Sequence, residues 1–146
     1  MKYKKQPAYL ALTCVVLAAC GAKNPQTPKP LNSPRALERR LSEIAGQANQ
    51  AAPADIDANT RLEGVKAGPG LKLTSTYTLV NPESEGISTE TFATKLTPVV
   101  TESSCKNPDL RPLIDQGVVV VLEYRGTDGK PIGTLSINHD SCAALK

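Results

Sequence analysis

The stretch that decides the fold runs from Cys105 to Cys142 and reads CKNPDLRPLIDQGVVVVLEYRGTDGKPIGTLSINHDSC. Its first third predicts a short helix, because Asn107 is a capping residue followed by proline, and Gly117 stands where a left-handed helix end is expected. One cysteine closes each end of the stretch. We therefore expect a unit that begins with a helix and whose two ends lie close together.

The rest of this stretch predicts a β-hairpin. The run VVVVLEYR, residues 118–125, is rich in β-branched residues and is the most strand-like segment of the chain. Its first half is apolar on both faces, which favours an interior position in a sheet. The sequence GTDG at residues 126–129 predicts a turn into a second strand, which begins near Pro131.

Upstream of this unit, the sequence predicts one helix and two strands. Ser33 and Pro34 form a helix start, and apolar residues recur at helical spacing over about 34–51. We interpret the charged side of this helix as a solvated face, with a docking surface as the alternative. Residues 60–67 and 71–80 predict an antiparallel hairpin, since the second run alternates apolar with threonine or lysine.

The segment between the strand ending at residue 80 and Cys105 predicts helix. Ser88 is a capping residue for a helix over about 89–96, and Pro98 is expected to kink or split the segment. The whole pattern predicts an α+β domain in the order α-β-β-α-α-β-β. We expect a four-stranded, mainly antiparallel sheet with helices packed on one face and one disulfide.

The stretch before the first strand has the alternate spacing of a calcium loop at Asp55, Asp57 and Asn59. The match fails where the chemistry is strict, because Thr60 replaces the glycine of the sharp turn and Lys66 replaces the bidentate glutamate. We interpret the stretch as a linker into the strand, and we predict no metal site.

The first residues have the three parts of a secretory signal, namely a basic start, an apolar run from Ala8 to Ala19, and small residues before Cys20. The apolar run is too short to span a bilayer comfortably in the mature protein. The tetrapeptide LAAC at residues 17–20 resembles the bacterial lipobox, whose cysteine is lipidated and becomes the first residue after cleavage. We expect a lipoprotein signal peptide over 1–19, with a plain signal peptide and a chance cysteine as the alternative.

Residues 20–33 are expected to form the lipidated Cys20 and a proline-rich tether, and residues 34–146 a single α+β domain. In a polyproline-like state the tether would reach about 40 Å. Gly21 stands where the lipoprotein sorting rule would place aspartate for retention in the inner membrane. The expected location is therefore the outer membrane, with a lipid anchor and the domain facing the periplasm.

Charge and aromatic content exclude one class of partner. The formal net charge of +3 comes from three lysines of the leader, so the mature chain carries 14 basic and 14 acidic side chains. Its aromatic residues are Tyr77, Phe92 and Tyr124. Such a neutral surface lacks the basic field and stacking platforms that nucleic-acid binding needs. The membrane is contacted instead through the lipid on Cys20.

The cysteines predict one disulfide. Cys14 leaves with the leader and Cys20 carries lipid, so Cys105 and Cys142 remain in an exported domain. An oxidising compartment favours their pairing. The alternative is two free thiols in a metal or redox site, which no CxxC spacing or ligand cluster supports.

No catalytic residue or cofactor site is predicted. The single histidine, His139, is interpreted as a surface residue in a turn after the last strand. The chain contains no G-x-S-x-G elbow. We expect a protein that is not an enzyme and that binds another protein.

A C-x-x-P pattern at Cys105, a helix closed by Gly117, the GTDG turn and the closing Cys142 resemble the beta class of small secretion pilotin lipoproteins. The resemblance covers roughly residues 88–142, the lipobox and an N-terminal helix. Pilotins of this class are outer-membrane lipoproteins with a disulfide-tied mixed domain, and they bring a type II secretin subunit to the outer membrane by binding its C-terminal helix. The resemblance implies a helix-binding adaptor, and it transfers no binding residue.

A second hypothesis remains open from the sequence. The hairpin over residues 60–80 resembles a broad set of small uncharacterised envelope proteins, and a periplasmic inhibitor or binding lipoprotein is the alternative to an adaptor. Such a protein would block a target enzyme with a protruding loop. The candidate loops are ESEG at residues 83–86 and GTDG at residues 126–129.

Overall fold

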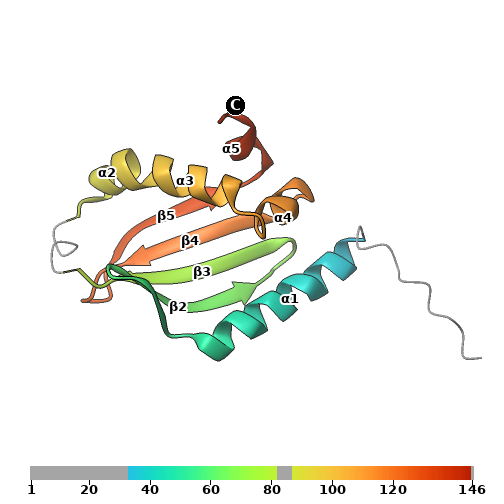
Figure 1. The fold of residues 1–146 in the computed structure, drawn as a ribbon, viewed down its shortest axis with the longest axis horizontal. Helices are drawn as coiled ribbons and strands as arrows, with labels where there is room; N and C mark the ends of the chain where they lie inside the picture. Colours follow the sequence, from blue (N-terminus) through green and yellow to red (C-terminus); the bar gives the residue numbers. More distant parts are fainter. Residues whose placement is uncertain (1–32, 82–86, 146) are drawn as a thin grey trace, which may run out of the picture.

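The computed structural model describes residues 33–81 and 87–145, and they form one five-stranded sheet with helices on one face (Figure 1). The spatial order of the strands follows the chain. Every neighbouring pair is antiparallel except β3 with β4, which are parallel. The strands are β1 (Ala54–Asp57), β2 (Thr60–Ala67), β3 (Lys72–Leu79), β4 (Val119–Arg125) and β5 (Pro131–Ile137).

The helices lie before, between and after these strands. Helix α1 runs along β2, whereas the helical segment between β3 and β4 runs along β5 (Figure 1). None of the helices in the described residues is long and apolar enough to cross a membrane. The helical elements are α1 (Pro34–Ala51), α2 (Thr89–Thr91), the π-helical turn η2 (Phe92–Leu96), α3 (Thr97–Lys106), α4 (Arg111–Asp115) and α5 (His139–Ala143).

The sheet differs from the predicted four-stranded, mainly antiparallel one in two respects: it has five strands, and one of its strand pairs, β3 with β4, is parallel. The stretch that we interpreted as a linker forms the edge strand β1, in which Asp55 pairs with Arg61 of β2 both in the backbone register and through an ion pair of 2.9 Å. The centre of the sheet is a parallel pair, because the helices between β3 and β4 carry the chain across the sheet before β4 starts. The order of elements therefore gains β1, and it also gains α5 at the end.

Several predictions are confirmed. Helix α1 has the predicted bounds, and the Ser33 hydroxyl accepts a hydrogen bond from the Ala36 N–H. Strand β4 lies between β3 and β5, as its two apolar faces indicated, and β5 starts at Pro131. Gly117 has a φ of 90°, and its left-handed conformation ends the short helix before β4.

Pro98 does not split the helical segment between β3 and β4. A π-helical turn precedes it, in which the Thr97 N–H donates to the Phe92 carbonyl. Proline has no N–H, and inside a regular helix its ring would clash with the carbonyl four residues earlier. The wider turn places Pro98 in the first turn of α3, where no backbone N–H is needed. The segment therefore stays helical from Thr89 to Lys106.

One face of the sheet carries the core. The register places Leu73 beside Val120 and Tyr77 beside Tyr124, all on the face that the helices cover. The opposite face is polar and open, with a row of threonines along β3 and charged residues on β2 and β4. The fully buried residues of the core include Leu41, Ile114, Val118, Val120 and Ile137.

The edge of β2 is closed partly by a strand and partly by a side chain. Strand β1 pairs only with the first half of β2. Beyond it, the side-chain amide of Asn49 in α1 accepts from the Val65 N–H and donates to the Val65 carbonyl, both at 2.8 Å. Gly64 leaves room for this amide, since a Cβ there would come within 3.3 Å of its oxygen. Asn49 therefore satisfies backbone groups that would otherwise form an open strand edge.

Candidate binding groove

A groove lies on the helix-covered face of the sheet. It consists of two adjoining hollows of about 550 and 460 Å³, which share Asp57, Thr60, Leu79 and Leu96 as lining residues. Helix α3 forms one wall and the β1–β2 hairpin the other. The sheet forms the floor, where β3 and β4 run in parallel.

The lining of the 460 Å³ hollow is mostly apolar. The floor presents two tyrosines and two leucines, and the walls add aliphatic side chains. Ile56 on the hairpin is 58% exposed although it is a large apolar residue, and it lines the groove. The apolar lining residues are Ile56, Tyr77, Leu79, Leu96, Val100, Leu110, Leu122 and Tyr124. An apolar concave surface of this kind suits the apolar side of another protein segment.

Aromatic rings organise the floor. The rings of Tyr77 and Tyr124 stack with centroids 5.3 Å apart, and Phe92 packs against Tyr124 with centroids 5.2 Å apart. Burial raises the pKa of the Tyr77 phenol and raises that of Tyr124 to about 12. Both phenols are therefore neutral at physiological pH.

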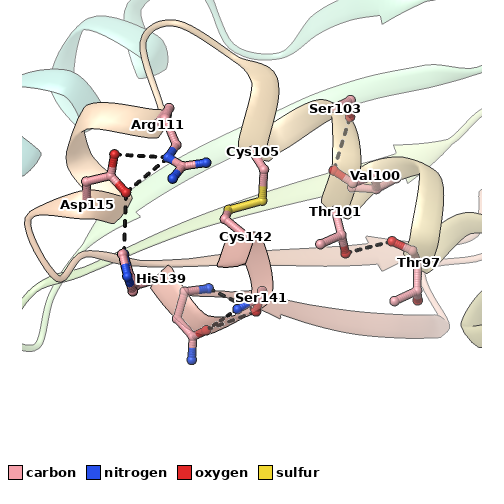
Figure 2. Close-up of a disulfide and its surroundings, with 11 residues drawn as sticks. Thr97, Val100, Thr101, Ser103, Cys105, Arg111, Asp115, His139, Ser141 and Cys142 are labelled. Atoms are coloured by element: carbon pink, nitrogen blue, oxygen red, sulfur yellow. Dashed lines mark hydrogen bonds and ion pairs between the residues drawn. A yellow bond between two sulfur atoms is a disulfide. The ribbon is translucent and has the colours of Figure 1, made fainter. Parts of the chain in front are cut away.

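The helical segment formed by η2 and α3 is fixed at both of its ends. At one end, the Phe92 ring lies directly on Gly133 of β5, so closely that a Cβ at this position would overlap the ring. At the other end, Cys105 forms the disulfide with Cys142 of α5 (Figure 2). Four residues between these two fixed points line the groove, namely Leu96, Val100, Ser103 and Ser104, so this wall has a defined position.

Helix α5 was not predicted, and its first residue is His139. A signal was present in the sequence, because Asn138 and Ser141 form a capping box in which each side chain bonds the other residue's backbone N–H. The His139 side chain is exposed, and its Nδ1 lies 3.4 Å from Asp115 Oδ1 (Figure 2). Arg111 also donates to Asp115, and mainly for that reason the pKa of this carboxyl is lowered. The polar cluster therefore joins α4 to α5 beside the disulfide.

The other residues singled out in the sequence are placed as follows. Cys20 and the ESEG loop lie outside the described residues. The GTDG turn is bonded within itself and to its neighbour, since Asp128 accepts from the Lys130 N–H and forms an ion pair with its ammonium group, both at 2.9 Å. Lys130 thereby lowers the pKa of the Asp128 carboxyl. The GTDG turn is not among the residues that line the groove.

No protein-family model matches the chain, and no curated protein matches it significantly. Solved structures do match. The pilotin EpsS of the Vibrio vulnificus type 2 secretion system superposes with a TM-score of 0.64 at 16% identity, over 75% of this chain and 94% of that one. This chain has the fold of the type II secretion pilotins.

Two further structures agree. The type II secretion pilotin AspS of Vibrio cholerae gives a TM-score of 0.61 at 19% identity, again over 75% of this chain and 94% of the other. A protein of Pseudomonas aeruginosa classed as a candidate secreted protein gives 0.64 at 17% identity, over 78% and 98%. The pilotin-like fold therefore covers nearly the whole of each neighbour, although sequence identity is low.

The sequence pattern predicted this fold family but none of the groove residues. Ile56 was missed because we compared its stretch with a calcium loop on the basis of the aspartates and interpreted it as a linker. Tyr77 and Tyr124 were considered only as part of the low aromatic content. The groove lies between the β1–β2 hairpin and α3, which are distant in the chain. A local sequence pattern does not reveal such an arrangement.

Proposed function

We propose that this chain is a lipid-anchored, non-enzymatic adaptor that captures the C-terminal helix of a secretin in the groove, as a pilotin does. The observation that carries the proposal is the apolar groove on a pilotin-like fold. The fold supports the class of protein, and the groove supplies a surface of suitable chemistry.

The shape of the groove favours a helix over an added strand. A bound helix presents apolar side chains at spacings of three and four residues and needs an apolar surface on several sides, and apolar side chains line the floor and both walls of the groove. Strand addition needs a free sheet edge with unpaired backbone groups. On the second half of β2 the Asn49 amide already occupies such an edge.

The proposed anchor and tether place the groove within the envelope. Lipidation of Cys20 at the outer membrane and a tether over residues 20–33 would hold the domain of residues 34–146 within about 40 Å of the lipid. A secretin captured there would be delivered to the membrane in which it assembles.

The test is titration of the purified protein with the C-terminal segment of the secretin encoded in the same genome. Ile56→Asn should weaken binding about tenfold, because it removes an exposed apolar contact from the groove wall. Val99→Asn is the matched control, since Val99 on α3 is 65% exposed and does not line the groove. Melting curves of both variants check that the fold is kept.

Equal effects of the two substitutions would show that the groove is not the binding surface. In cells, deletion of the gene should leave the secretin in the inner membrane. A secretin that still reaches the outer membrane in the deletion strain would contradict the adaptor function itself.

A further inference from the structure

One charged side chain faces the groove. Among the described residues that line its two hollows, Asp57 is the only one that carries a formal charge, and it belongs to both hollows. The remaining lining is apolar or neutral. A single negative charge in an apolar groove constrains what can bind there, because burying it without a partner is costly.

A β-bulge directs Asp57 into the groove. Asp55 pairs with Arg61 and Asp57 pairs with Thr60, so the register shifts by one residue between the two aspartates. In a regular strand, residues two apart lie on the same face. The bulge changes this: Asp55 meets the Arg61 guanidinium, whereas Asp57 joins Tyr77 and Tyr124 in the groove lining.

Among the described residues, the carboxylate of Asp57 has no cationic partner. Its Oδ1 accepts the Asn59 N–H at 2.7 Å, and it forms no ion pair with any of the residues that the structure describes. The negative charge of Asp57 acts on the floor of the groove, because it adds to the effect of burial in raising the pKa of Tyr124. The negative charge is therefore available to a ligand that enters the groove.

We infer that the helix bound in the groove carries one lysine or arginine at the border of its apolar face, and that this residue pairs with Asp57. The inference rests on the proposed function and names the chemistry of the partner. A long basic side chain suits this position, because its methylenes pack on apolar surface while its charged end reaches the carboxylate. A helix without such a residue would desolvate Asp57 with no compensation, so the same aspartate also selects against other apolar helices.

A double-mutant cycle tests this pairing. The probes are the secretin C-terminal peptide and the same peptide with its groove-facing basic residue replaced by glutamine. The wild-type protein should bind the basic peptide about tenfold more tightly, and Asp57→Asn should remove that preference. Asp55→Asn is the matched control, because it removes the neighbouring charge of the same strand outside the groove, and it should keep the preference.

The outcomes separate this inference from the proposed function. If Ile56→Asn weakens binding but wild type and Asp57→Asn both fail to distinguish the two peptides, the charge pairing is wrong and the helix-binding groove stands. If Ile56→Asn has no effect, the groove itself is wrong. A secretin C-terminal segment that lacks any basic residue would also overturn the pairing.

A second measurement needs no partner. In a Tyr77→Phe background, the tyrosinate absorbance of the processed protein reports the pKa of Tyr124 alone. Asp57→Asn should lower this pKa and Asp55→Asn should leave it unchanged, because only Asp57 faces the phenol. The same pKa in both variants would show that Asp57 does not face the floor, and the inference would fall.

Discussion

The two walls of the groove are built in different ways. The α3 wall is fixed at one end by Phe92 on Gly133 and at the other by the disulfide between Cys105 and Cys142. The hairpin wall rests on a four-residue edge strand with a bulge, and it carries the exposed Ile56. The first wall is held by covalent and tightly packed contacts, and the second by a few exposed ones.

The two walls therefore have different roles in the proposed binding. A fixed α3 gives the groove a shape before any partner arrives, which reduces the entropy that binding must overcome. The hairpin wall contributes the exposed Ile56 and Asp57, which is the one charged residue among the described lining residues and with which the proposed helix would pair. Changes on the α3 side should therefore affect stability most, and changes on the hairpin side should affect binding most.

The largest effect on stability is expected from the disulfide. Replacing both Cys105 and Cys142 by alanine should lower the free energy of unfolding by about 4 kcal/mol, because the unfolded chain regains the freedom of a long closed loop. Urea unfolding of the variant and of the reduced wild type should agree. A loss below about 1 kcal/mol would mean that the disulfide does not hold the α3 wall.

The second largest effect is expected at the other fixed point. Gly133→Ala should cost about 1–3 kcal/mol, since the methyl group overlaps the Phe92 ring and forces the π-helical turn to move. Gly46→Ala is the control, because a Cβ there meets no atom within 4 Å and Gly46 is an exposed residue of α1. The free energy of unfolding of Gly46→Ala should rise by up to about 1 kcal/mol. Equal losses of stability in both variants would refute the close approach of Phe92 to Gly133.

A smaller effect is expected beside the hairpin wall. Asn49→Ala removes both hydrogen bonds to Val65 and should cost about 1–2 kcal/mol, because the freed backbone groups are only partly open to water. Gln50→Ala changes an exposed neighbour on the same helix and should be close to neutral. Thermal or urea unfolding of the two variants distinguishes them. A neutral Asn49→Ala would show that the β2 edge needs no closure.

The smallest effect is expected from the exposed ion pair next to the disulfide. Arg111 lowers the pKa of Asp115. The stabilisation from this ion pair is therefore present above the ordinary pKa of a carboxyl group, and it is lost as the pH falls through the lowered pKa of Asp115. Arg111→Gln should therefore flatten the acid side of the stability profile slightly and raise the pKa of Asp115. Since both side chains are exposed, an effect as large as that of the disulfide would contradict the account of how α3 is held.

Local chemistry explains which parts of this structure could be predicted. Caps, helical periodicity and turn residues are short-range signals, so α1, the helix end at Gly117 and the strand β4 were predicted correctly. The expected export of the chain predicted the disulfide, and Cys105 and Cys142 are bonded. The edge strand β1 was missed because its two aspartates disfavour a strand, and its pairing is supported by Arg61 across the strands.

The groove could not be predicted for a different reason. Its walls come together through the parallel pairing of β3 and β4, which depends on how the crossover helices pack. The direction of Asp57 depends on a one-residue bulge, and nothing in the alternation of the sequence indicates it. Such features follow from tertiary register, and only the three-dimensional structure shows them.

The most direct test of the central claim is to map backbone amide chemical shifts while the secretin C-terminal peptide is added to the isotope-labelled protein. We expect the shifts to concentrate at Ile56, Leu96 and Val100, which line the groove. Thr74 and Thr134, on the open face of the sheet, should remain unchanged. Shifts that concentrate on the open face while the groove residues stay unchanged would contradict the central claim.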